Sequence, residues 1–167
     1  MSLAIQILNE GISKKEKFKY ALNDVRAADG SLNFDDDKMD CSEFFLSCVK
    51  SVSSELYTKL TEKLANGKVG GNTKTIQKGI IVIEGIDNIS NLPNSEPKVG
   101  DWLIWSGHIE MIEKVTPEKR VITLGANGKE GGLVPKNIDS KSLESAKNIA
   151  ANFIGIWTPR LNSTSLT

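Results

Sequence analysis

The clearest strand pattern in this 167-residue chain is Gly100-Asp-Trp-Leu-Ile-Trp-Ser-Gly-His-Ile-Glu-Met-Ile112, and it sets the expected fold. Its aromatic and β-branched residues predict one strand at Asp101–Trp105 and a second at His108–Val115, with a Ser-Gly turn between them. Ile109 and Met111 alternate with polar positions, which indicates that the second strand is half-buried. The centre of the chain is therefore predicted to form a sheet.

Further elements are predicted on both sides of this centre. An apolar strand is expected before it at Ile80–Glu84. A hairpin turn at Thr116–Lys119 leads into the next strand at Arg120–Leu124. A helix at Ser140–Ala151 and a closing strand at Phe153–Trp157 complete the pattern.

The N-terminal half reads as helices. A short helix is expected first, broken near Gly11, and a second helix begins at the capping-box residue Ser13. A third helix starts near Cys41, is interrupted at Ser51–Ser54 and continues to about Ala65. The apolar stripes that carry the first two helices are Ile5, Leu8 and Ile12, then Phe18, Ala21, Leu22 and Val25. Helices first and strands later predict an α+β fold, with N-terminal helices packed on an antiparallel sheet.

Composition narrows the class of protein. With 39% hydrophobic and 25% charged residues, residues 1–167 are expected to form a single globular domain. The 21 basic and 21 acidic side chains balance, so we expect no nucleic-acid partner and no membrane partner. A single histidine excludes a multi-histidine zinc site. We expect no bound metal and no cofactor.

The N-terminal residues predict where the protein is made. MSLAIQILNEG has no basic region and no long apolar run, so we expect no secretory signal peptide and synthesis in a cytoplasm. The longest apolar run, Ile80–Ile83, is the length of a strand and too short for a membrane span.

Two cysteines, Cys41 and Cys48, are candidates for chemistry. On one helix their Cα atoms would stand ~10 Å apart, which is too far for a disulfide, so both are expected to be thiols. Cys41 lies where a loop becomes a helix, and the unpaired N–H groups of a helix N-terminus favour a thiolate nucleophile. The alternative is that Cys41 is a small core residue. Cys48 lies on an apolar stripe and is assigned to the core.

A cysteine nucleophile needs a base, and His108 is the one imidazole in the chain. Asn127 follows the strand that should pair with the His108 strand, so it could accept the imidazole N–H and fix the tautomer. Asn127-Gly128 also reads as a simple turn. Glu110 shares a strand face with His108 and is the other candidate for orienting the imidazole.

Together these motifs resemble the NlpC-type and CHAP-type cysteine peptidases, which are papain-like cell-wall amidases and endopeptidases. The resemblance rests on Asp40-Cys41-Ser42, Gly100-Asp101-Trp102 and Gly107-His108-Ile109, and on the closing segment Phe153–Arg160. It covers about Met39 to Arg160. It implies a papain-like fold, Cys41 as nucleophile, His108 as base and Asn127 as third residue.

The resemblance also implies a substrate, an amide bond of peptidoglycan stem or cross-link peptides. A wall hydrolase without a signal peptide would reach a periplasm or cell wall by another route. Small members resemble antibacterial effectors of type VI secretion, which have cognate immunity proteins. The alternatives are a prophage lysin domain and a catalytically silent binding module of the same fold.

Two features near the nucleophile depart from the pattern or add to it. Glu43 stands where the family often has glycine, so it is expected to narrow or charge the cleft beside Cys41. The run Asp35–Asp37 with Asp40 is rich in the oxygen ligands that calcium prefers. It lacks an extended ligand pattern, so we interpret it as a solvated acidic loop.

Overall fold

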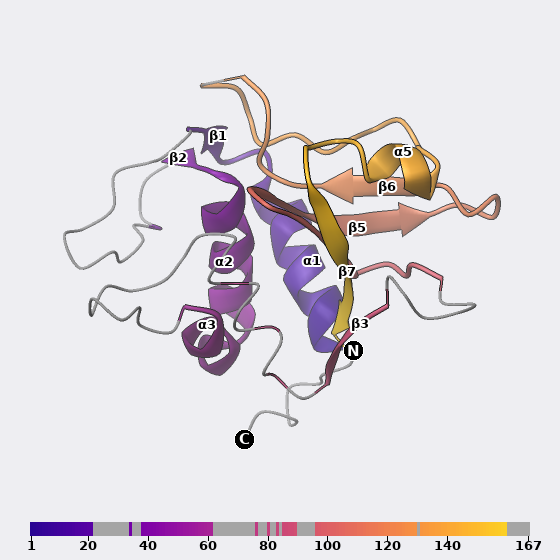
Figure 1. Ribbon diagram of the computed structural model, residues 1–167. Coiled ribbons are helices and arrows are strands. Elements are labelled where there is room, and N and C mark those ends of the chain that lie inside the picture. The colour runs from indigo at the N-terminus through magenta and orange to yellow at the C-terminus, as the bar shows by residue number, and fades with distance from the viewer. Residues whose placement is uncertain are drawn as a thin grey trace.

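The computed structural model describes residues 1–21, 34, 38–61, 76, 80, 83, 85–89, 96–129 and 131–159. Its helices and strands follow the order helix, short strands, helices, sheet (Figure 1). The elements are α1 Leu3–Lys14, β1 Lys19–Tyr20, β2 Lys38–Met39, α2 Cys41–Val52, α3 Ser54–Leu60, β3 Ile86–Asn88, β4 Trp102–Trp105, β5 His108–Val115, β6 Val121–Leu124, α5 Leu143–Ala146 and β7 Phe153–Pro159. The fold is α+β, as predicted.

The main sheet is antiparallel and has the strand order β3-β7-β4-β5-β6. Strands β4 and β5 pair from Trp102↔Met111 to Trp105↔His108, so the tight turn at Ser106-Gly107 joins them. The hairpin between β5 and β6 closes through the N–H of Lys119, which donates to the carbonyl of Thr116. The last strand, β7, returns between β3 and β4. The predicted strands of the hairpins and the closing strand are confirmed.

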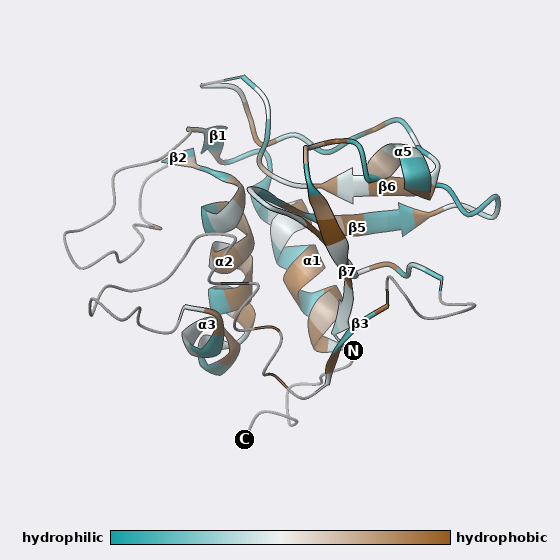
Figure 2. Cartoon of the chain, viewed as in Figure 1, coloured by the Kyte–Doolittle hydropathy of each residue, from teal (hydrophilic) through white to brown (hydrophobic). Residues whose placement is uncertain are grey.

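Two apolar clusters cover the two faces of this sheet, as period-two alternation requires. On one face α1 and α2 pack over β4, β5 and β6, and Figure 2 shows hydrophobic stretches along these two helices and β7. On the other face a smaller cluster includes Ala146 of α5 with Leu103, Trp105 and Ile112. Burial on both faces means that β5 is buried from His108 to Ile112, so its prediction as a half-buried strand was wrong there.

The helix α1 runs through Gly11 without a break. A Cβ at this position would stand 2.9 Å from Cε of Met111 and 3.1 Å from Cδ2 of Leu124, so glycine lets α1 lie close against the sheet. The predicted second helix from Ser13 was wrong. Ser13 lies inside α1, where its hydroxyl donates to the carbonyl of Glu10, and Lys19–Tyr20 forms β1. Leu22 and Val25 lie outside the described residues.

Three other predicted boundaries differ from the structure. The strand predicted at Ile80–Glu84 was wrong at its two described residues, because the N–H of Ile83 donates to the carbonyl of Ile80 in turn geometry, and the other three residues lie outside the described part. The described strand in this region is β3, which begins at Ile86. The helix predicted at Ser140–Ala151 shortens to α5, because Lys141 exchanges hydrogen bonds with Val121 and is held extended. The interruption before α3 is confirmed at Ser53, and α3 ends at Leu60.

The short strand β1 lies between two segments: the residues that precede α2 and the segment that follows β6. β1 pairs in parallel with β2, with Tyr20 beside Met39. On its other side, Tyr20 donates to Gly132 and Val134 donates to the carbonyl of Phe18. The residues before Cys41 and the segment after β6 are therefore tied to the same short strand. None of the helices in the described part of the chain combines the length and apolar character of a membrane span.

Candidate active site

The site begins at the N-terminus of α2. Asp40 is the N-cap, and its carboxylate accepts the N–H of Glu43 at 2.9 Å and the hydroxyl of Ser42 at 2.9 Å. This is why the helix begins at Cys41, as predicted: the cap satisfies one of the donors that a helix start leaves open. Cys41 is half-buried, and its N–H belongs to the first turn, where no carbonyl within the helix can accept it.

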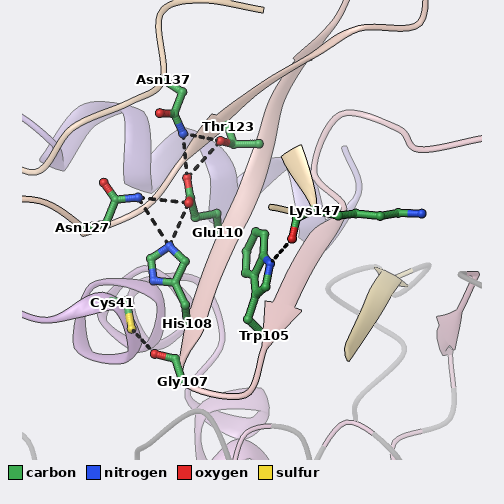
Figure 3. Close-up of polar contacts among 9 residues, drawn as sticks. All are labelled: Cys41, Trp105, Gly107, His108, Glu110, Thr123, Asn127, Asn137 and Lys147. Carbon is green, nitrogen blue, oxygen red and sulfur yellow. Dashed lines mark hydrogen bonds and ion pairs between the residues drawn. The ribbon is translucent and has the colours of Figure 1, made fainter. Parts of the chain in front are cut away.

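Cys41 contacts the turn directly before β5, the strand that carries His108. Its sulfur lies 3.7 Å from the carbonyl oxygen of Gly107, directly before His108 (Figure 3). The helix α2 packs on one face of the sheet, whereas His108 pairs with Trp105 and points to the other face. They can meet because each is the first residue of its element, at the same end of the sheet. The structure thus brings these two predicted site residues together.

The other side of the imidazole faces a carboxylate. His108 Nε2 lies 2.8 Å from Oε2 of Glu110, whose side chain is 1% exposed. Burial disfavours the imidazolium, but hydrogen bonds with Cys41 and with the Glu110 carboxylate outweigh it and raise the pKa of His108 to about 9. Figure 3 shows Nδ1 on the side of Cys41. The imidazole therefore bridges the thiol and the carboxylate.

Each oxygen of Glu110 receives two hydrogen bonds. Oε2 faces His108 and accepts the amide of Asn127 at 3.1 Å. Oε1 accepts the hydroxyl of Thr123 at 2.9 Å and the amide of Asn137 at 3.0 Å (Figure 3). These donors take the place of water around a carboxylate that is buried. They also fix its orientation, with Oε2 against the imidazole nitrogen.

Asn127 lies beside the imidazole, but its geometry fits a contact with Glu110 better. Its Nδ2 is 3.4 Å from His108 Nε2 and 3.1 Å from Oε2 of Glu110. If Nε2 donates to Glu110, it cannot also accept from the amide. Turning the amide over would bring its oxygen to 3.1 Å from a carboxylate oxygen, which is unfavourable. Of the two candidates for orienting the imidazole, the one in direct hydrogen-bond geometry is Glu110.

An aromatic side chain covers the imidazole. The ring centroid of Trp105 lies 5.3 Å from that of His108. Trp105 is held in turn by Nε1, which donates to the carbonyl of Lys147 at 2.7 Å (Figure 3). Since Trp105 is fully buried, it keeps water from this side of the histidine.

The remaining sequence expectations have mixed outcomes. Both cysteines are free thiols, and Cys48 is buried in the core, where burial raises its pKa to about 12. Glu43, which was expected to narrow or charge a cleft beside Cys41, is 1% exposed, so its side chain is buried. Asp40 is the buried cap of α2 and not part of a solvated loop, while Asp35–Asp37 lie outside the described residues. Among the described residues no cluster of side chains is arranged to hold a metal ion.

Sequence reasoning missed Thr123, Gly125 and Asn137. The register Met111↔Leu124, continued past the end of β6, sets Gly125 opposite Glu110 and Asn127 opposite His108. Period two from Asn127 would therefore have indicated Gly125 and Thr123. Asn137 carried no such signal, because it lies in an irregular segment.

Replacement of Gly125 by alanine is expected to destabilise the protein by about 2 kcal/mol, because the new Cβ would overpack the site. It would stand 2.4 Å from Cγ of Glu110 and 3.0 Å from the carbonyl of Ile109. Urea unfolding measures the change. Gly107→Ala is the matched control for stability, because its Cβ would meet no atom within 4 Å. Equal stabilities of the two variants would contradict the prediction.

Comparisons with known proteins bear on the fold. No protein-family model matches this sequence, and no curated protein matches it either. The similar solved structures include two that are described as an N-acetylmuramoyl-L-alanine amidase from Bacteroides uniformis ATCC 8492. Their TM-scores are 0.57 and 0.55 at 12% sequence identity, and each comparison covers 93% of this chain and 97% of the other. The chain therefore shares an overall fold with these amidases.

Proposed function

We propose that this protein is a papain-like cysteine amidase or endopeptidase of the NlpC or CHAP type, which hydrolyses an amide bond of peptidoglycan peptides. The observation that carries the proposal is the placement of the thiol of Cys41, at a helix N-terminus, beside an imidazole whose far nitrogen faces the buried carboxylate of Glu110. A nucleophile, a base and a group that orients the base are the parts that covalent amide hydrolysis needs.

Acylation uses the thiol and the imidazole in turn. The proton of the Cys41 thiol moves to Nδ1 of His108, and the thiolate forms a bond to the carbonyl carbon of the amide. The backbone N–H of Cys41 donates to the oxyanion, because it lies in the open first turn of α2. His108 then gives the proton to the amide nitrogen, and the C–N bond breaks. A thioester and a free amine result.

Deacylation reverses the roles of the same groups. His108 takes a proton from a water molecule as that water attacks the thioester carbonyl. The C–S bond then breaks, the carboxylic acid leaves, and the proton returns to the sulfur. In both half-reactions Glu110 accepts the Nε2–H and stabilises the imidazolium, so the reacting nitrogen stays Nδ1.

The substrate class is proposed from the resemblance of the motifs together with the fold shared with N-acetylmuramoyl-L-alanine amidases. In the same proposal the protein acts in a periplasm or cell wall as an antibacterial effector, with a cognate immunity protein as partner.

The test is digestion of muropeptides followed by mass spectrometry. Purified peptidoglycan is cut into disaccharide peptides with a muramidase, incubated with the protein, and analysed for new amino and carboxyl ends. A freed stem peptide would identify the muramoyl-to-alanine bond, and a shortened stem or a resolved cross-link would identify a peptide bond. Protein treated with iodoacetamide is the control and should be inactive. Unchanged muropeptides with folded, untreated protein would refute the proposal and favour a silent module.

A further inference from the structure

The inference starts from the oxygen of Glu110 that does not face the histidine. Oε1 receives the hydroxyl of Thr123 at 2.9 Å and the amide of Asn137 at 3.0 Å. These two donors also touch each other, since Nδ2 of Asn137 lies 2.7 Å from Oγ1 of Thr123. The Glu110 carboxylate therefore lies between these two donors and the imidazole, and the donors are on the side of the carboxylate away from Cys41 (Figure 3).

The backbone holds both donors in place. Thr123 belongs to β6, and its side chain shares a sheet face with Glu110 because Thr123 pairs with Ile112. Asn137 follows a bridge between Lys136 and Leu124, and its N–H donates to the carbonyl of Thr123 at 2.8 Å. The amide of Asn137 is thus fixed by the same strand that carries the hydroxyl.

We propose that Thr123 and Asn137 are positioning residues that hold the side chain of Glu110 in place and aim its Oε2 at His108. The role deepens the proposed function, on which its catalytic meaning rests. The carboxylate needs such partners because its side chain is 1% exposed and water cannot supply the donors.

The charged groups around the imidazole show why the orientation of Glu110 is important for His108. Glu110 faces His108 from β5 and Cys41 faces it from α2. Asp40, the carboxylate next to Cys41 in the sequence, accepts hydrogen bonds from Ser42 and Glu43 of α2. Lys136 forms an ion pair with Glu113. Glu110 is therefore the counter-ion of the imidazolium that forms when His108 takes the proton of Cys41.

The orientation of Glu110 gives a direction for the effect. Without a donor at Oε1 the carboxylate is no longer held with Oε2 against Nε2 of His108. The imidazolium is then less well stabilised, and the proton that it shares with Cys41 returns more readily to the sulfur. Loss of a donor at Oε1 should therefore shift the pH dependence of Cys41 reactivity: as the pH is lowered, the reactivity should disappear at a higher pH than in the wild type.

The test compares Thr123→Val with Thr123→Ser. Valine keeps the shape of threonine and removes the hydroxyl, whereas serine keeps the hydroxyl and removes the methyl group. The measurement is the rate of alkylation of Cys41 by iodoacetamide as a function of pH in the full-length folded protein. Cys48 does not interfere, because it is buried and burial raises its pKa to about 12; Cys41→Ser should confirm this by showing no alkylation.

We expect the acid limb of the rate profile to move upward by about one pH unit in Thr123→Val and to stay in place in Thr123→Ser. Asn137→Ala should move it in the same direction and serves if Thr123→Val does not fold, because Asn137 is only half-buried. Asn148→Ala is the matched control, since that amide bonds to the carbonyl of Glu144 at the surface. An unmoved limb in both Thr123→Val and Asn137→Ala, or an equal shift in the serine variant, would overturn the inference.

Alkylation needs no peptidoglycan, so the two proposals can fail separately. A shifted limb in a protein that leaves muropeptides intact would keep the positioning role and remove the proposed substrate. Cleavage of muropeptides with an unmoved limb would do the opposite.

Discussion

Replacement of Cys41 by alanine should lower the rate of muropeptide cleavage by at least about 10⁴-fold, because no thioester can form without the sulfur. The substitution removes a half-buried thiol that makes a weak S–H contact with the carbonyl of Gly107 and a hydrogen bond with His108. The cap of α2 is made by Asp40 and stays intact. The fold should therefore survive, and circular dichroism with urea unfolding should match wild type within about 1 kcal/mol.

The matched control is the other cysteine. Cys48→Ala removes a fully buried thiol in the core, so it should cost stability and leave activity unchanged while the protein is folded. The two variants therefore separate chemistry from packing. A folded Cys41→Ala protein that still cleaves muropeptides would show that the nucleophile lies elsewhere.

Replacement of Glu110 by glutamine should have the second-largest effect, a fall in cleavage rate of about 10³- to 10⁴-fold. Glutamine keeps the shape of the side chain but removes the charge that stabilises the imidazolium. An amide also has donors of its own, so it no longer specifies the Nε2–H tautomer. The pKa of His108, about 9 in the wild type, should fall by 1–3 units, as the opposite charge is lost.

This fall can be measured directly because the chain has one histidine. Its imidazole signals in an NMR titration are therefore assigned without ambiguity. The control is Glu113→Gln on the same strand, which removes the ion pair with Lys136 and should leave the pKa of His108 in place. A wild-type pKa in Glu110→Gln would contradict the bridging role of the imidazole.

The same shift makes stability depend on pH. The pKa of His108 is raised from 6.5 to about 9 in the folded state, which adds about 3 kcal/mol to the free energy of unfolding. The whole of this contribution is present at pH values below 6.5. That contribution is lost as the pH rises from 6.5 through about 9, because the folded state then gives up its extra proton. Glu110→Gln should lose much less stability across this window.

Local patterns in the sequence were sufficient for most elements of the site. The start of α2 near Cys41 followed from an apolar stripe after a polar loop, and β5 followed from aromatic and β-branched residues after a Ser-Gly turn. The errors lie where a distant contact overrides such a pattern. Gly11 stays helical because the sheet packs against it, and Lys141 is extended because Val121 pairs with it.

The partners of the site were harder to predict than its centre. Asn127 was expected to orient the imidazole because it follows the paired strand, and the structure does bring it within 3.4 Å of His108. The choice between Asn127 and Glu110 depends on fractions of an ångström and on which group donates, which a pattern of residue types cannot resolve. The burial of Glu43 was likewise hidden, since an acidic residue in a first helical turn is usually solvated.

The sequence alone determined that one thiol begins a helix and that one imidazole begins a strand, because both depend on neighbours within a few residues. Only the tertiary structure decided that they meet, since α2 and His108 belong to opposite faces of the sheet and touch only at its end. It also decided that Thr123 and Asn137 converge on Glu110. That convergence depends on the register of β5 with β6 and on the return of an irregular segment, and neither is encoded by local periodicity.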